Sequence, residues 1–334
     1  MMSNYKVFNE GMTINGQTFE EQKTYSENVD LFCDAKLNYC DNAADMLIGS
    51  DFIDFDTCKA NLYAKVTPLS GIHDDTGKDC MYKHLRADKL KVGRSLTYCE
   101  LASDAASCIK SVARAVGNTH GKKNEFVQND DFASSVMLSG KAPMYENTAS
   151  ENRLVCTSER LTYAGFGSYP LVVCDGEAPV LSSSGSSGTF VLRGDYASVA
   201  AAGGYDRIMN LGNYSKIACV GGGDEVLSEG EYAKIVCLSG HSRIVTNGNN
   251  STVLADGNEV FVSSRGTDDI VVNLSKDGAA KGNIGTFLTL AEYKEDNDGN
   301  LSPINVITQK IDGIKLLPDT WYTLVEGQFR AIPE

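Results

Sequence analysis

The sequence predicts a mainly β protein built around a two-sided, β-roll-like β-solenoid with eighteen residues in each coil. Three observations predict this fold. A large apolar residue recurs at every ninth position, a glycine follows most of these four residues later, and the residue directly after each apolar anchor alternates in size with a period of eighteen. We expect a small α+β domain at 1–123, the solenoid at 124–282 and a C-terminal β-meander cap at 283–334.

The nine-residue period is the strongest of these signals. All sixteen positions in steps of nine from Val136 to Val271 hold a large apolar or aromatic residue. At the chain's apolar frequency of 42%, chance would give such a series about once in a million. Twelve of the sixteen anchors are followed four residues later by glycine, as at Gly194 and Gly203. Glycine adopts positive φ without a steric penalty, so each unit is predicted to be a short strand and a tight turn.

Two such units make one coil, because nine residues cannot enclose a core whereas two strands of about four residues with two turns can. The residue after the anchor is bulky on alternate strands and mostly small on the others, as at Ala164 and Ala200. The bulky row consists of Met137, Val155, Val173, Val191, Met209, Leu227 and Val245. A three-sided coil of three units is the alternative. We expect about eight coils and a rod roughly 38 Å long, with Val199 stacked on Ile217.

The N-terminal residues carry signals for two helices and two strands. Asp41 and Asn42 form a cap for a helix at 42–48, and Thr97 and Glu100 form a capping box for a second helix that ends near Gly117. The apolar face of the second helix is expected to hold Leu101, Ala105, Ile109, Val112 and Val116. Segments 62–66 and 89–92 have the alternation of half-buried strands.

The C-terminal residues are expected to form strands at 286–293 and 304–311, with turns at Asp-Gly and Glu-Gly pairs. An uncovered solenoid end would leave unpaired strand edges that recruit other chains. Trp321, Tyr322 and Phe329 are suited to cover that end.

Composition limits the partners and the location. The 334-residue chain has a formal charge of −14, so it repels a phosphate backbone and a nucleic-acid partner is not expected. No apolar segment of a secretion signal follows Met1, and no apolar run is long enough for a membrane span. We therefore predict a cytoplasmic or virion-associated protein without a membrane partner.

The ten cysteines are expected to be reduced and mostly buried. Cys156 and Cys174 are eighteen residues apart, as are Cys219 and Cys237, so each pair should stack on adjacent coils without a disulfide. Titration of the unfolded protein should find close to ten free thiols.

Candidate chemical sites are weak. Cys33, Cys40, Cys80 and His84 are zinc-ligand types, but their spacing fits no standard zinc site. Asp51, Asp54 and Asp56, with residues 73–75, could form an acid–base cluster, although solvated loop carboxylates are the favoured interpretation. Asp296, Asp298 and Asn300 fit a hairpin turn better than a calcium loop, and the turns of the rod lack the carboxylate ladder of a calcium-binding β-roll. We therefore expect no cofactor and no metal, and assign no catalytic residue.

Several segments carry a family resemblance. Segment 194–203 is close to a Gly-Asp-Tyr-Ser-Thr-Ala-Ala-Thr-Ser repeat, and 281–285 and 317–322 match a Lys-Gly-x-x-Gly stretch and the segment that follows it. Segments 5–8, 23–25 and 33–42 match an N-terminal domain with a Cys-x-x-Gly-Phe-His-Ala-Cys-x-Asn motif. In these features the chain resembles a family of uncharacterised phage- and prophage-type proteins. Asn38 stands where that family has histidine, and the resemblance implies a fold but no activity.

Two functional hypotheses follow. In the first, the protein is a non-enzymatic rod that presents or joins partners, with a protein or carbohydrate ligand and a phage or prophage setting. In the second, an N-terminal enzyme domain is carried on a solenoid spacer. A deep pocket that gathers Asn38, His73 or His84 with carboxylates would favour the second hypothesis, and a shallow surface would favour the first.

The bulky row at 137–245 is the candidate binding site. If the anchors point inward, the residues of this row point outward and form a continuous apolar stripe, which soluble monomers rarely expose. We predict that the stripe pairs with its own copy in an isologous homodimer. The alternative is that one of the terminal domains folds back and covers it.

Overall fold

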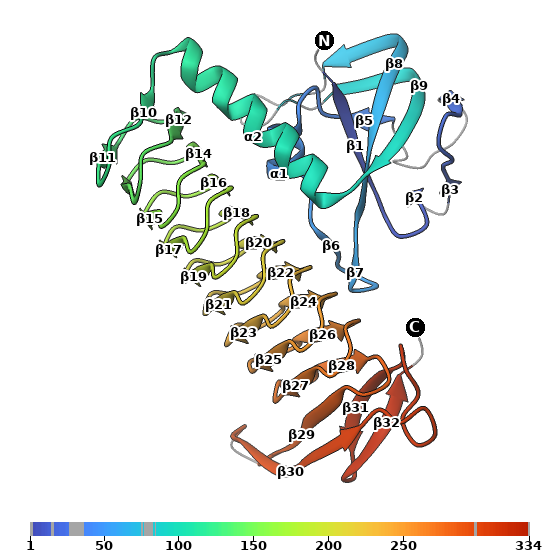
Figure 1. The fold of residues 1–334 in the computed structure, drawn as a ribbon. Helices are drawn as coiled ribbons and strands as arrows, with labels where there is room; N and C mark the ends of the chain where they lie inside the picture. The colour runs from blue at the N-terminus through green and yellow to red at the C-terminus, as the bar shows by residue number, and fades with distance from the viewer. Residues whose placement is uncertain are drawn as a thin grey trace.

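The computed structural model describes residues 3–14, 17–26, 37–74, 76, 83, 85–296 and 299–332. A long rod of stacked coils forms the body of the molecule, the N-terminal domain lies along one side of it, and the C-terminal strands lie at one end (Figure 1). The fold is mainly β, as predicted, with a β-solenoid as its largest part.

Two sheets of parallel four-residue strands face each other across the rod, apart from a shorter first strand and a longer last one. The first sheet contains β10 (Thr119–His120), β12 (Ser135–Leu138), β14 (Arg153–Cys156), β16 (Leu171–Cys174), β18 (Thr189–Leu192), β20 (Arg207–Asn210), β22 (Glu225–Ser228), β24 (Arg243–Thr246), β26 (Phe261–Ser264) and β28 (Ala279–Gly282). The second contains β11 (Phe126–Asn129), β13 (Met144–Asn147), β15 (Thr162–Gly165), β17 (Val180–Ser183), β19 (Ser198–Ala201), β21 (Lys216–Cys219), β23 (Lys234–Cys237), β25 (Thr252–Ala255), β27 (Ile270–Asn273) and β29 (Phe287–Glu295).

The register of these strands confirms the eighteen-residue coil. Val199 lies opposite Ile217 on the neighbouring strand, so the three-sided alternative is wrong. The rod has about ten turns rather than about eight. The estimate was too low because the parallel strands start at Thr119 and continue to β29, beyond the anchors at 136–271 from which the repeat was counted.

The rod is filled by the apolar anchors together with small residues. The anchors Val136, Phe190 and Val271 are buried. Cys156 lies opposite Cys174 and Cys219 opposite Cys237, as predicted, and all four thiols are free. Burial raises the pKa of the Cys156 and Cys237 thiols, which makes them poor nucleophiles.

The turns correct one part of the prediction. Gly194 and Gly203 do not have positive φ; the left-handed residue comes two positions after such a glycine, as at Tyr196 (φ 61°). These glycines are required because successive coils approach closely. A Cβ atom at Gly194 would lie 2.0 Å from the carbonyl oxygen of Gly176 in the preceding coil. Glycine is therefore required at this position of the repeat because a side chain would clash with the neighbouring coil, and not because of its φ angle.

The N-terminal domain is a twisted antiparallel sheet with two helices. The sheet contains β1 (Asn4–Phe8), β4 (Thr24–Ser26), β5 (Asn38–Tyr39), β8 (Leu62–Asp74) and β9 (Leu85–Leu96), and two short hairpins pair β2 (Thr13–Ile14) with β3 (Gln17–Thr18) and β6 (Ile53–Asp54) with β7 (Lys59–Ala60). Helices α1 (Ala43–Gly49) and α2 (Tyr98–Ala115) begin at the predicted caps, Asn42 and Thr97. Val112 and Val116 were expected on the buried face of α2 but are exposed. The buried face includes Ala102, Ala106 and Ala113 in their place.

The C-terminal end is closed by two hairpins. Strand β30 (Leu301–Lys310) pairs with β29, and β31 (Trp321–Val325) pairs with both β28 and β32 (Gln328–Ile332). Each sheet of the rod thus ends in its own antiparallel hairpin rather than in one meander. Tyr322 lies in the core of the rod and Phe329 packs against that core, as expected for residues that cover the end.

Candidate functional site

The bulky outward row is buried under the N-terminal domain. Val155, Val173, Val191, Met209, Leu227 and Val245 are each 0% exposed, and Met137 is half-buried against the same cluster. The cluster also includes residues of α1 and α2, which lie across the first sheet (Figure 1). The prediction of an exposed apolar stripe is therefore wrong, because the stripe is not exposed. These seven residues dock a domain of the same chain, which was the alternative interpretation.

Polar contacts hold the docked segment at several coils of the rod. Residues 45–55 run along the rod, and outward side chains at the first position of β14, β20, β22 and β24 contact them. The contacts join Asp45 to Arg153 (2.6 Å), the Ile48 and Ser50 carbonyls to Arg207 (2.6 and 2.7 Å), the Phe52 and Ile53 amides to Glu225 (2.8 and 3.3 Å), and the Phe55 carbonyl to Arg243 (3.1 Å). Arg207 thereby satisfies carbonyl groups at the C-terminal end of α1, where no helical donor is available.

Sequence reasoning missed this docking row, although a signal was present. Arg207, Glu225 and Arg243 are spaced by eighteen residues, and each precedes a bulky residue of the outward row by two positions. Charged residues that recur with the coil period beside an apolar row indicate a polar rim around a buried contact.

Burial changes the titration of this interface. Desolvation raises the pKa of Glu225 to about 7, with a smaller contribution from the negative charge of Asp51, and the two amides that its carboxylate accepts act in the opposite direction. Desolvation also lowers the pKa of the Arg243 guanidinium.

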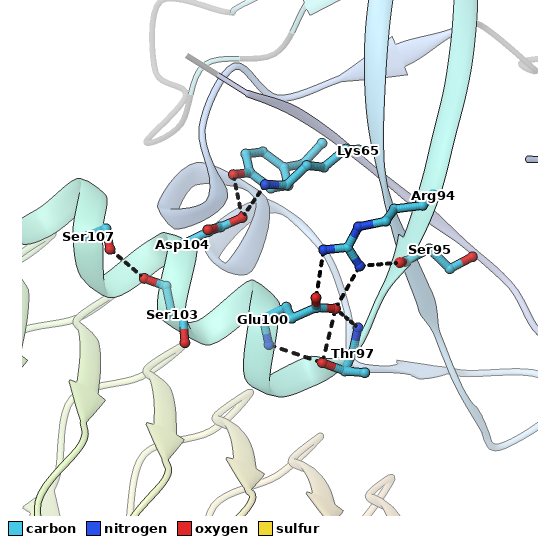
Figure 2. A network of polar contacts seen from close by, with 9 residues as sticks. Lys65, Arg94, Ser95, Thr97, Glu100, Ser103, Asp104 and Ser107 are labelled. Carbon is cyan, nitrogen blue, oxygen red and sulfur yellow. Dashed lines mark hydrogen bonds and ion pairs between the residues drawn. The ribbon is translucent and has the colours of Figure 1, made fainter. Parts of the chain in front are cut away.

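A polar network joins the β8–β9 hairpin to the first turns of α2 (Figure 2). Arg94 makes a two-pronged ion pair with Glu100 at 2.6 and 3.0 Å, and these contacts lower the pKa of Glu100 to about 2. One turn further along, Asp104 accepts the Lys65 ammonium at 2.8 Å and the Tyr5 hydroxyl at 2.9 Å. Both cations have carboxylate partners, so the open pocket of about 230 Å³ between them offers no uncompensated charge to a ligand.

The acid–base candidates that the structure describes contact other groups rather than one another, and most of the predicted metal ligands lie outside the described residues. The Asp54 carboxylate accepts the backbone amide of Thr57 within its own turn, and His73 pairs with Asp88 at 3.0 Å on an exposed surface. Asn38 and His73 lie on strands either side of Arg86 in β9. Cys33, Asp75, Cys80, His84 and Asp298 lie outside the described residues. Within the described ranges, no group of three histidine, cysteine or acidic residues is placed to hold a metal.

The second sheet of the rod has a bare outer face. Its outward positions include the small residues Ala164, Ser182, Ala200 and Ala218 along the middle. Exposed apolar side chains flank them, among them Phe166, Val180, Val220 and Leu238, which are 51–59% exposed. No helix covers this face in the part of the chain that the structure describes (Figure 1).

A ladder of tyrosines runs along one margin of this face. The rings of Tyr196, Tyr214 and Tyr232 stack nearly parallel, with centroids 5.2 and 4.9 Å apart. All three residues are exposed, and all three have positive φ, between 57° and 61°. Glycine or asparagine would adopt this conformation at lower cost, so the backbone does not account for the tyrosines.

Comparison with protein-family models, with curated proteins and with solved structures finds no match for this chain. Of the helices in the described segments, none has the length and apolar character needed to cross a membrane.

Proposed function

We propose that this protein is a non-enzymatic binding module, and that the bare face of the second sheet is the surface on which it receives a protein partner. The observation that carries the proposal is the contrast between the two faces of one rod. The apolar outward row of the first sheet is covered by its own chain, whereas the second sheet presents exposed Phe166, Val220 and Leu238 to solvent. Exposed apolar groups gathered on one face are typical of interaction sites.

The chemistry of the face favours a protein ligand over a charged polymer. Small residues along its middle make it flat, and its margin carries the tyrosine ladder, a residue type enriched in protein interfaces. Because the rings already stack on one another, they lose little conformational freedom when a partner binds. The other occupants that we consider for this face are a carbohydrate and further copies of this chain. The setting that we consider is a phage or prophage.

A selection experiment tests the proposal. Wild-type protein should enrich binders from a displayed random-peptide library, and the double variant Ala200→Lys/Ala218→Lys should bind them at least tenfold more weakly, because two stacked lysines would cover the flat centre. The matched control is Ser139→Lys/Thr157→Lys, which places two lysines eighteen residues apart on the margin of the first sheet and should bind normally.

Two results would contradict the proposal. One is a wild type that enriches no peptide, including the case in which it binds soluble polysaccharides instead. The other is a face variant that binds the selected peptides as tightly as the control variant does.

A further inference from the structure

A pocket of about 270 Å³ lies where three separate parts of the chain meet. The hairpin turn between β6 and β7 contributes Phe55 to Cys58, the rod contributes Arg243 and Phe261, and the C-terminal hairpin contributes Trp321 and Ile332. Concave sites lined by aromatic side chains at the junction of domains are where proteins most often bind small molecules.

Arg243 gives this pocket its chemical character. Its side chain is buried, with only 7% of the residue exposed, and its guanidinium carbon lies 3.9 Å from the ring centroid of Phe55 and 4.4 Å from that of Phe261. Nε donates to the Phe55 carbonyl, and Nη1 donates to the carbonyls of Ser242 and Glu259. These three bonds fix the plane of the guanidinium.

The guanidinium has no direct ion-pair partner among the described residues and keeps unused donors. Among the described residues, Arg243 forms no ion pair, and its Nη2 group has no hydrogen-bond acceptor. The carboxylates of Glu259, Asp56 and Glu225 attract the guanidinium from a distance, but none of them lies within ion-pair range of it. An anion that reached Nη2 would add the direct charge-assisted pair that the buried guanidinium does not have.

We propose that this pocket binds a small aromatic carboxylate, whose carboxylate accepts hydrogen bonds from Nη2 of Arg243 and whose ring packs among the aromatic side chains. Phe261 and Trp321 already meet edge to face, with ring centroids 5.6 Å apart, and form an apolar wall for a planar ligand. The thiol of Cys58 is buried on the same side, where it contacts the Phe261 carbonyl at 3.8 Å.

Ligand binding at this pocket would favour the docked arrangement of the chain. Phe55 belongs to the N-terminal domain, Arg243 to the rod and Trp321 to the C-terminal hairpin, so the pocket exists only while all three are assembled. A ligand that binds only the assembled form stabilises it by mass action.

The single tryptophan of the chain, Trp321, lines the pocket and reports on binding. Titration of the full-length protein with 3-phenylpropionate should change the tryptophan emission and saturate. The neutral amide, 3-phenylpropionamide, and the cationic 3-phenylpropylamine should bind at least tenfold more weakly, because neither supplies the negative charge that the guanidinium lacks.

Two variants separate the pocket from the general stability of the fold. Arg243→Met should weaken 3-phenylpropionate binding at least tenfold. Because that change also removes docking bonds, Ile332→Phe is the second variant: it narrows the pocket without touching Arg243 and should weaken binding as well. Val325→Phe, on the other strand of the same hairpin and outside the pocket, should bind as the wild type does.

The proposal is overturned if the wild type does not bind 3-phenylpropionate, if the amide binds as tightly as the acid, or if Ile332→Phe and Val325→Phe bind equally well. None of these results bears on the bare face of the second sheet, which is tested with separate ligands and separate variants.

Discussion

The core of the rod contains buried carboxylates. Asp206 and Asp224 are almost completely inaccessible, and each accepts a backbone amide from the preceding coil, from Gly188 at 2.7 Å and from Asp206 at 3.0 Å. Desolvation raises the pKa of Asp206 to about 7 and raises that of Asp224 as well. These side chains join successive coils, at the cost of burying groups that ionise readily in water.

The pH dependence of stability follows from the direction of this shift. Asp206 in the unfolded chain titrates near its ordinary pKa of about 4. Between about pH 4 and the folded-state pKa of about 7, the unfolded chain releases a proton that the folded chain retains, so stability falls as the pH rises. Asp206→Asn keeps the acceptor for the Gly188 amide and removes the titration, so the variant should lose less stability from pH 5 to pH 8, by about 2–4 kcal/mol.

Urea unfolding at the two pH values measures this difference. Asn213→Ser is the control, because it removes an uncharged acceptor of the outer ladder, which bonds the Glu231 amide at 2.9 Å, and should shift the stability equally at both pH values. An Asp206→Asn protein with the full wild-type pH dependence would contradict the assignment.

At the scale of elements, the rod and its docked segment follow different rules. A strand of the rod is specified locally, by its anchor, its small partner and the glycine that lets the next coil approach. The segment from α1 to β7 is specified by side chains that come more than a hundred residues later, such as Arg153, Arg207 and Glu225. Its position therefore depends on the completed rod.

Arg207→Met tests the docking of this segment. The substitution keeps an apolar stem but leaves the Ile48 and Ser50 carbonyls without their donor, so the free energy of unfolding should fall by about 2–4 kcal/mol. Lys216→Met, an exposed change at the equivalent position of the second sheet, should alter it by less than about 0.5 kcal/mol. Denaturant titration compares the two variants, and equal effects would show that Arg207 does not fasten α1 to the rod.

The elements that the sequence predicted are those with local signals. The coil length, the stacking of Val199 on Ile217 and the caps at Asn42 and Thr97 could all be derived from spacing and residue type. What covers the bulky row could not be derived from the sequence. An outward apolar stripe has the same sequence pattern whether it binds a second copy or a domain of its own chain. The pocket around Arg243 could not be foreseen either, because it joins three segments whose proximity depends on that docking.

At the scale of the whole molecule, the rod has one covered face, one bare face and one end closed by hairpins (Figure 1). The covered face gives the chain a second apolar core without a partner, since residues of α1 and α2 pack on Val173, Val191 and Met209. The bare face lies on the other side of a rod whose core is only two side-chain layers thick. Domain docking uses one face of the scaffold, and the partner binding that we propose would use the opposite face.

The accessibility of engineered thiols tests this division of faces most directly. Val191→Cys places a thiol on the covered face, and Ala200→Cys places one on the bare face. The folded proteins are labelled briefly with a maleimide. Peptide mapping then distinguishes labelling at these positions from labelling of the native exposed Cys99. The account predicts rapid labelling at position 200 and labelling at position 191 only after unfolding. Equal labelling rates at the two positions in the folded protein would contradict it.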